Sequence, residues 1–243
     1  MEKFIFTAVS GAERTLRAQQ VRSNNLANTD TPGFRANIEL ASAQALAANG
    51  YGYDDVHLAR NEADAVSTRN GTVRETGRSL DVAVNGNGYL AVEWGEGEAY
   101  TRAGAIAIDA NGALTVGGRP LLGEGGPIVL PPHTAVDIAN DGTISVMPEG
   151  GLLTQIIDRL RLVSAEGAQL AKNEAGMIVP RDGQPLAADP NVTVRGGALE
   201  GSNVSAVEEM VAVMSLNRSF EMQMKMLKAS DSMNESGNRL LGA

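Results

Sequence analysis

Residues 202–243 read SNVSAVEEMVAVMSLNRSFEMQMKMLKASDSMNESGNRLLGA, with no proline among them. Ser205 stands three residues before Glu208, which is the spacing of a capping box, so we expect a helix to begin here. Apolar side chains then recur every three or four residues, as they do along the seam of a coiled coil. The predicted seam consists of Val207, Met210, Val213, Asn217, Phe220, Met224 and Leu227.

This helix carries more apolar surface than one seam requires. Further apolar residues fall on its other faces, among them Val211, Met214, Leu216, Met222 and Met226. A helix that is apolar nearly all round is buried on several sides. Its many charged residues exclude a single membrane-spanning helix. The helix therefore belongs either to the core of a large domain or to an assembly of many chains.

A second helical pattern lies near the other end of the sequence, from Phe4 to Leu26. Its stripe steps by four and three residues and is rich in small side chains, which predicts close packing. The stripe consists of Ile5, Val9, Ala12, Leu16, Gln19, Ser23 and Leu26. Because no other long helical pattern is present, we expect the two terminal helices to pair and to bracket the rest of the chain.

The motif NNLANTDTPGF occupies residues 24–34 and ends the first helix. Pro32 lacks a backbone donor and Gly33 permits a turn, so the helix must stop before them. Asn24, Asn25 and Asn28 are weak helix formers. Their amides are expected either to satisfy the end of the helix locally or to bond to the backbone of neighbouring subunits.

The middle of the chain changes to short strand patterns separated by glycine-containing turns, from Leu80 to about Arg195. Residues 109–112 (DANG) and 140–142 (NDG) stand between strand-like runs and predict hairpins. Strand and helix patterns do not alternate, which disfavours an α/β fold. We therefore expect an α+β protein with long N- and C-terminal helices paired as a coiled coil and a central, mostly antiparallel all-β domain.

Four segments are expected along the chain. They are the N-terminal helix and turn over residues 1–33, an irregular connecting segment over 34–77 with a possible short helix at 36–48, the β domain over 78–196, and the C-terminal coiled-coil helix over 197–243. Residues 1–33 and 203–243 would together form a helical inner domain.

Composition excludes several functional classes. The net charge is −9 with both signs mixed, which argues against a nucleic-acid-binding surface. No apolar run is long enough to span a membrane, and the first residues lack the pattern of a cleavable signal peptide. Without cysteine the chain has no disulfides and no thiolate metal site. This absence suits a chain that crosses an oxidising space or an export channel.

The sequence gives little sign of chemistry. Residues 85–88 (NGNG) lack the third glycine and the following helix of a nucleotide-binding loop. No zinc-protease or nucleophile-elbow motif is present. We therefore expect no enzyme activity, no catalytic residue, no cofactor and no metal.

Several motifs, in this order along the chain, resemble the flagellar rod and hook proteins of bacteria. They are NNLANTDTPGF at 24–34, LDVAVNGNGY at 80–89, YTRAG at 100–104, GEGGPI at 123–128, and SNV at 202–204 with VEEM at 207–210. The length, the pair GPI (126–128) and DRLRLV (158–163), and MQMKM (222–226) are most similar to the proximal rod proteins. The distal rod proteins are the near alternative.

The resemblance implies a structural subunit of the basal-body rod that assembles helically through its terminal helices and transmits torque. Its partners would be copies of itself, other rod proteins and the flagellar type III export apparatus. It would lie in the periplasmic rod, exported without a cleavable signal. A coiled-coil adhesin-type binding module is the alternative from another class. The expected assembly interface is Ile5, Val9, Leu16, Asn24, Asn25, Leu26, Asn28, Pro32, Gly33, Val207, Met210, Met214, Phe220, Met224 and Leu227.

Overall fold

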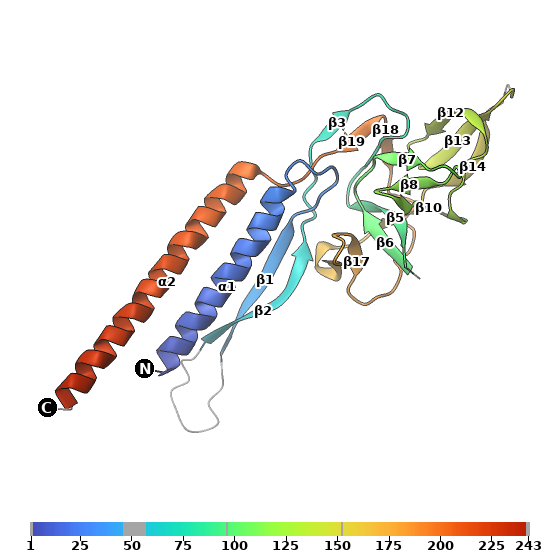
Figure 1. Ribbon diagram of the computed structural model, residues 1–243. Helices are drawn as coiled ribbons and strands as arrows, with labels where there is room; N and C mark the ends of the chain where they lie inside the picture. The colour runs from blue at the N-terminus through green and yellow to red at the C-terminus, as the bar shows by residue number, and fades with distance from the viewer. Residues whose placement is uncertain (1, 46–56, 96, 152, 242–243) are drawn as a thin grey trace. The chain divides into compact units, whose positions relative to one another are not determined.

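The computed structural model describes residues 2–45, 57–95, 97–151 and 153–241. Its two α-helices are α1 (Glu2–Ala27) and α2 (Ala206–Leu241), one near each end of the chain (Figure 1). Strands and one short 3₁₀ helix, η1 (Gly167–Gln169), lie between them in the sequence. Every strand pairing with a described register is antiparallel. The prediction of an α+β protein with mostly antiparallel sheets is therefore confirmed.

The strands are short and form several small sheets. In chain order they are β1 (Asn37–Ala45), β2 (His57–Val66), β3 (Val73–Glu75), β4 (Val82–Val84), β5 (Gly88–Trp94), β6 (Gly97–Thr101), β7 (Ile106–Ile108), β8 (Leu114–Val116), β9 (Arg119–Pro120), β10 (Leu122–Gly123), β11 (Gly126–Pro127), β12 (His133–Ile138), β13 (Thr143–Pro148), β14 (Gln155–Arg159), β15 (Leu162–Ser164), β16 (Leu170–Lys172), β17 (Ile178–Pro180), β18 (Val194–Gly196) and β19 (Ala198–Glu200). The largest sheet among the described residues has the order β15-β5-β6-β17-β16.

The chain divides into two compact units. The first contains α1, β1, most of β2, and α2. The second contains the turn Asn28–Ala36 and the chain from Ala65 to Val204. The chain therefore leaves the second unit for a helix at two points, before Asn28 and after Val204.

The two strands of the first unit were not predicted. Residues 34–77 were expected to be irregular, with a short helix at 36–48, and this is wrong for β1 and β2, which pair as a two-stranded sheet. The alanine-rich composition of residues 36–48 favours a helix. Pairing with β2 overrides that weak preference.

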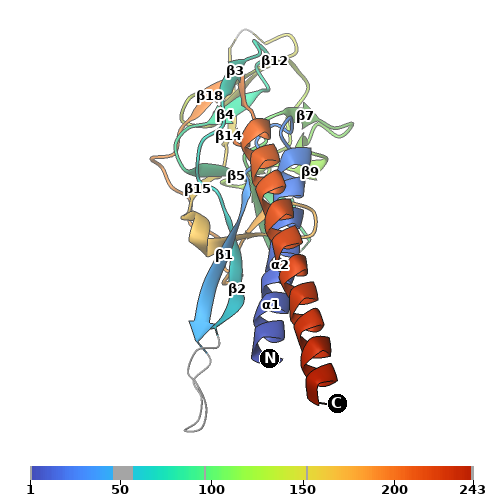
Figure 2. The same cartoon turned by 90° about the vertical axis from the view of Figure 1, so that its left-hand side faces the viewer.

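The helices α1 and α2 run side by side in opposite directions in both views (Figures 1 and 2). Two polar contacts join them: Arg22 forms an ion pair with Glu209 at 3.1 Å, and the Thr15 hydroxyl lies 3.4 Å from Gln223 Oε1. A Cβ built on Gly11 would lie 3.3 Å from Gln223, so the helices approach closely at this glycine. The contacting face of α1 is therefore made of small and polar residues.

The predicted seam of α2 agrees with the structure at Val213, Phe220 and Leu227, which are half-buried, and is wrong at Val207, Met210, Asn217 and Met224, which are exposed. The less exposed positions of α2 follow a three-and-four spacing that begins at Glu209, namely Glu209, Val213, Leu216, Phe220, Gln223, Leu227, Ser230 and Asn234. Val207, Met210 and Met224 of the predicted seam are exposed, as are Val9 and Leu16 of α1. The less exposed face of α2 thus mixes large apolar residues such as Leu216 and Phe220 with polar ones. Other large apolar residues, among them Val207, Met210 and Met214, are left exposed.

The second unit buries both faces of its five-stranded sheet. Successive side chains of a strand point to opposite faces. Leu90 and Val92 of β5 join one apolar cluster, and Tyr89 and Ala91 join another on the opposite side. All four are at most 1% exposed.

Both predicted hairpins are confirmed. The turn at 109–112 joins β7 to β8, and Asp109 Oδ1 accepts hydrogen bonds from the backbone N–H groups of Asn111 and Ala113 at 2.9 and 2.7 Å. The turn at 140–142 joins β12 to β13, and Asp141 Oδ1 accepts the N–H of Thr143 at 3.0 Å. These aspartates close their turns locally, which is why the sequence signal is strong here.

Candidate functional site

The segment Asn28–Ala36, called the signature turn below, begins where α1 ends. Its first bend is closed by Asn28, whose backbone carbonyl accepts the Thr31 N–H at 3.3 Å and whose Oδ1 accepts the Thr31 hydroxyl at 3.1 Å. Phe34 N–H donates to the Thr31 carbonyl at 3.2 Å. Pro32 is exposed at the outside of this bend. The predicted helix stop is therefore confirmed.

Asn25 is fully buried and bonds to the backbone of its own chain. Its Oδ1 accepts the Asn37 N–H at 2.9 Å and its Nδ2 donates to the Asn37 carbonyl at 3.1 Å. The amide thus pairs with the start of β1 as a neighbouring strand would. Asn25 therefore bonds to β1 of its own chain rather than to the end of α1, which was not predicted from the sequence.

Asn203 fixes the other end of the turn in the same way. Its Oδ1 accepts the Ala36 N–H and its Nδ2 donates to the Arg69 carbonyl, both at 2.8 Å. Its own N–H donates to the Phe34 carbonyl at 3.2 Å. Asn203 was not among the predicted site residues, although the SNV motif contains it. The signal that was missed is the residue type itself. An asparagine amide both accepts and donates, so it can bond to two backbone groups at once.

Gly33 lies against the chain that follows β6. Its φ is +69°, and a Cβ at this position would lie 2.2 Å from both the Arg102 carbonyl carbon and the Ala103 nitrogen. Its N–H donates to the Glu200 carbonyl at 2.8 Å. Only glycine satisfies both the backbone conformation and this close approach.

Three buried charged side chains meet beside the turn. Glu200 Oε1 lies 3.0 Å from Arg35 Nη2, and Glu200 Oε2 lies 2.9 Å from Arg102 Nη1. All three side chains are at most 2% exposed. None of the three was predicted as a site residue, although Arg102 lies in the YTRAG motif and Arg35 directly follows NNLANTDTPGF.

Lys172 of β16 contacts the signature turn. Its Nζ donates to the Arg35 carbonyl at 2.5 Å and lies 3.6 Å from the centre of the Phe34 ring. Burial lowers the pKa of Lys172 to about 8. The carbonyl and the ring favour the charged amine, but they offset only part of the cost of its desolvation.

The two helices expose large apolar side chains away from their mutual contact. On α1 these are Val9 and Leu16, and on α2 they are Val207, Met210, Val211, Met214, Met222, Met224, Met226 and Met233. Other predicted site residues, namely Leu26, Asn28, Gly33, Phe220 and Leu227, are half-buried, and Asn24 is exposed. The side chain of Ile5 lies outside the described residues.

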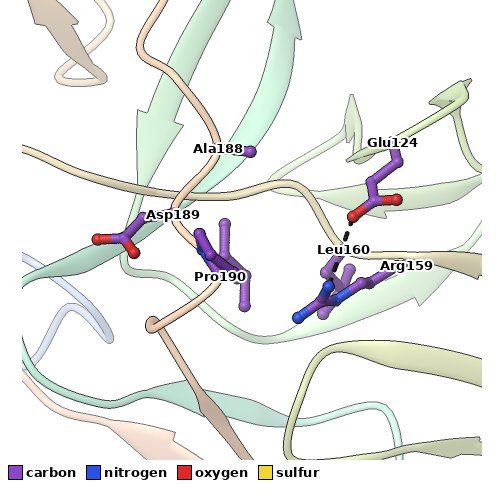
Figure 3. Close-up of a pocket in the computed structure, with 7 residues that line it drawn as sticks. Glu124, Arg159, Leu160, Ala188, Asp189 and Pro190 are labelled. Atoms are coloured by element: carbon purple, nitrogen blue, oxygen red, sulfur yellow. Dashed lines mark ion pairs between the residues drawn. The ribbon is translucent and has the colours of Figure 1, made fainter.

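One small pocket lies in the second unit, lined by Glu124, Arg159, Leu160, Leu162, Ala188, Asp189 and Pro190 (Figure 3). Glu124 and Arg159 form an ion pair at 3.6 Å across one side. Asp189 accepts the Ser164 hydroxyl at 2.7 Å and the Asn191 N–H at 2.9 Å, and these bonds lower its pKa. The charged groups that line this pocket thus form an ion pair and hydrogen bonds within turns, and they are not arranged around a reactive nucleophile.

Within the described ranges, no group of three or more His, Cys, Asp or Glu residues could hold a metal ion. No helix in those same ranges is long and apolar enough to cross a membrane.

Replacing Gly33 with alanine is expected to lower the free energy of unfolding of the purified chain by about 3 kcal/mol, because the methyl group strains the backbone and overlaps the chain at Arg102. The matched control is Gly77→Ala, since Gly77 has a φ of +72° but nothing within 4 Å of its Cβ position. There we expect a loss of only about 1 kcal/mol from the backbone conformation. Urea unfolding measures both, and equal losses would contradict the close approach.

Lys172 is expected to make stability depend on pH. Its pKa is about 8 in the folded chain and 10.5 without burial, so the unfolded chain binds more protons between these values. The free energy of unfolding should therefore rise with pH across this window. Urea unfolding of the unaltered chain and of Lys172→Met across the window isolates this contribution. Parallel pH profiles for the two proteins would show that Lys172 is not desolvated.

Comparison with known proteins assigns these features to a family. Residues 5–35 match the model of the flagella basal body rod protein, 83–146 the flagellar hook protein FlgE/F/G D1 domain, and 195–240 the flagellar basal body rod FlgEFG protein C-terminal region. The first match covers the signature turn as far as Arg35, and the third covers α2 except its last residue.

Full-length relatives agree with these matches. The flagellar basal-body rod protein FlgF of Salmonella typhimurium (strain LT2) is 38% identical over 99% of this chain and 99% of its own length, and FlgF of Escherichia coli (strain K12) gives the same values. The flagellar basal-body rod protein FlgG of Bacillus subtilis (strain 168) is 27% identical over 95% of this chain. The chain therefore belongs to the flagellar basal-body rod protein family.

Proposed function

We propose that this chain is a structural subunit of the proximal part of the flagellar rod. Its similarity to FlgF proteins supports this placement, because it extends over 99% of both chains at 38% identity. A distal-rod subunit of the FlgG type is the second candidate, supported by FlgG of Buchnera aphidicola (subsp. Acyrthosiphon pisum), which is 31% identical over 90% of this chain. The higher identity favours the proximal position.

The observation that carries the proposal is the apolar surface of the helices. Val207 is 68% exposed, Val211 56% and Met233 70%, and five further methionines on α2 are exposed with them. Contiguous apolar surface of this kind marks a protein–protein interaction site. The face that α2 turns toward α1 is already occupied, so the exposed face is available for other subunits.

We further propose that α1 and α2 pair as a coiled coil in the assembled rod, and that the remaining helix surface contacts neighbouring subunits. The proposed subunit-contact residues are Ile5, Val9, Leu16, Asn24, Leu26, Asn28, Pro32, Val207, Met210, Met214 and Met224, whereas Phe220 and Leu227 would pack within the helix pair. Asn25 and Gly33 would act within the chain by holding the signature turn. Head-to-tail contacts of this type generate a helical filament rather than a closed dimer.

The methionines suit a subunit that meets unlike neighbours. Six of them lie between Met210 and Met233. Methionine is flexible and fills irregular gaps, so one helix face can pack against surfaces of different shape. A proximal rod subunit would contact copies of itself and other rod proteins.

The remaining features of the proposal concern cellular context. The helical part would comprise residues 1–33 and 203–243, the connecting part 34–77, and the β domain 78–196. The subunit would pass through the flagellar type III export apparatus without signal cleavage and would function in the periplasmic rod. Its role would be to transmit torque, without enzyme activity.

Replacing Met214 with glutamine tests the proposed contact surface. Met214 is 53% exposed, so the free energy of unfolding should change by less than about 0.5 kcal/mol. Swimming of cells that carry only this variant should be lost or strongly reduced, because a polar amide would replace an apolar subunit contact. Met214→Leu is the matched control and should swim, since it keeps the apolar surface. Normal swimming with Met214→Gln would remove Met214 from the interface.

A further inference from the structure

Glu200 joins distant parts of the second unit at one buried point. Its two carboxylate oxygens contact Arg35 of the signature turn at 3.0 Å and Arg102, which follows β6, at 2.9 Å. Oε1 also accepts the Gly71 N–H at 2.7 Å, just before β3. Its backbone carbonyl accepts the Gly33 N–H at 2.8 Å. One residue therefore connects the signature turn, the chain before β3 and the chain after β6.

Hydrogen bonds from the two arginines fix the orientation of each guanidinium group, in addition to the pairing of its charge with Glu200. Arg102 Nη1 donates to the Val84 carbonyl at 2.6 Å, and its Nη2 donates to the Gly86 carbonyl. The Arg102 guanidinium also lies 5.3 Å from the centre of the Tyr89 ring. Arg35 Nη2 donates to Asn70 Oδ1 at 3.1 Å. Both guanidinium groups are consequently held by several elements at once.

Burying such a cluster costs desolvation free energy, so it contributes little net stability to a core. Two positive charges share one negative charge in a fully buried site, and burial, with the charge of Arg35 as the next cause, lowers the pKa of Arg102 to about 10. Arg35 Nε and Nη1 and Arg102 Nε have no hydrogen-bond partner among the described residues. Apolar side chains of similar volume commonly match or exceed the stability of buried ion clusters. Stability alone therefore does not account for these three residues.

Their placement suggests a different role. The chain leaves the second unit for α1 through the signature turn and for α2 through the segment after Glu200. Glu200 bonds directly to the first of these exits and lies three residues before Asn203, which bonds to the turn at Phe34 and Ala36. The two exits are thus fixed to each other inside the second unit.

We propose that Glu200 is the positioning residue for the signature turn, acting through Arg35 and Arg102 to hold both helix exits in the geometry that rod assembly needs. The proposal rests on the function proposed above, because it assigns the assembling parts of the chain to the helices and the turn. It predicts that losing the carboxylate frees the turn while the β core stays intact.

Hydrogen exchange of the purified full chain with Glu200→Gln tests this directly. The amide keeps the shape but leaves one guanidinium without a charged partner. Exchange at the backbone N–H groups of Gly33, Ala36 and Gly71 should accelerate roughly ten-fold or more, as local opening becomes easier. Exchange in β5 and β6 should stay unchanged. Glu124→Gln is the matched control, since its ion pair with Arg159 is exposed and of little energetic value.

Two outcomes would overturn the proposal. The first is unchanged exchange in the turn, and the second is equal acceleration in β5 and β6, which would make Glu200 a general stability residue.

A triple variant with apolar side chains distinguishes a role of the cluster in positioning the signature turn from a role in packing the core. Arg35→Met, Arg102→Met and Glu200→Leu together should leave exchange in β5 and β6 slow, yet the turn should exchange rapidly and cells should build no complete rods. Normal rods with this variant would contradict positioning by the cluster. If cells without the gene already built normal rods, the proposed function would fail, whereas the exchange result on the purified chain would still stand.

Discussion

The carboxylate of Glu200 holds two buried guanidinium groups and the Gly71 N–H at one point, where the signature turn meets the chain before β3 and the chain after β6. Glycines at 33 and 71 allow the surrounding backbone to approach it, since Cβ atoms there would lie 2.2 and 2.1 Å from neighbouring backbone atoms. Asn203 adds a second set of bonds to the same turn. Polar groups buried this deeply must be paired in a defined geometry, and that requirement specifies the turn more sharply than apolar packing could.

The first unit follows a different physical rule. Its helices contact each other through small residues and two polar pairs, Arg22 with Glu209 and Thr15 with Gln223, and leave much of their large apolar surface exposed. In water such surface is unfavourable, and burying it against other subunits provides a driving force for association. A chain with a firmly specified β unit and helices that keep their apolar surface for partners is suited to assembly.

Local signals in the sequence predicted most of the secondary structure. The capping-box spacing at Ser205, the stop at Pro32 and the turn aspartates 109 and 141 act over a few residues, so they can be recognised without the fold. The register of the helix pair could not be predicted in the same way. It depends on which face of α2 meets the small residues of α1, and both faces of α2 are apolar. The strands β1 and β2 were not predicted because the alanine-rich composition of residues 36–48 favours a helix, and only the pairing of the two strands overrides it.

The buried cluster of Arg35, Arg102 and Glu200 could not be predicted from the sequence, because its members are far apart along the chain. Arg102 and Glu200 are 98 residues apart, and neither belongs to a motif with its own chemistry. The family motifs at 24–34, 100–104 and 202–204 include Arg102 and stop just short of Arg35 and Glu200, and nothing in them indicates that these three residues form ion pairs. Only the fold brings these motifs together.

The most direct test of the rod assignment is to delete the gene and image the remaining basal bodies by electron microscopy. Loss of swimming together with basal-body rings that carry a truncated or absent rod is the result that this account predicts, and the position at which the rod stops would separate the proximal from the distal assignment. Complete rods and normal swimming in the deletion strain would contradict it.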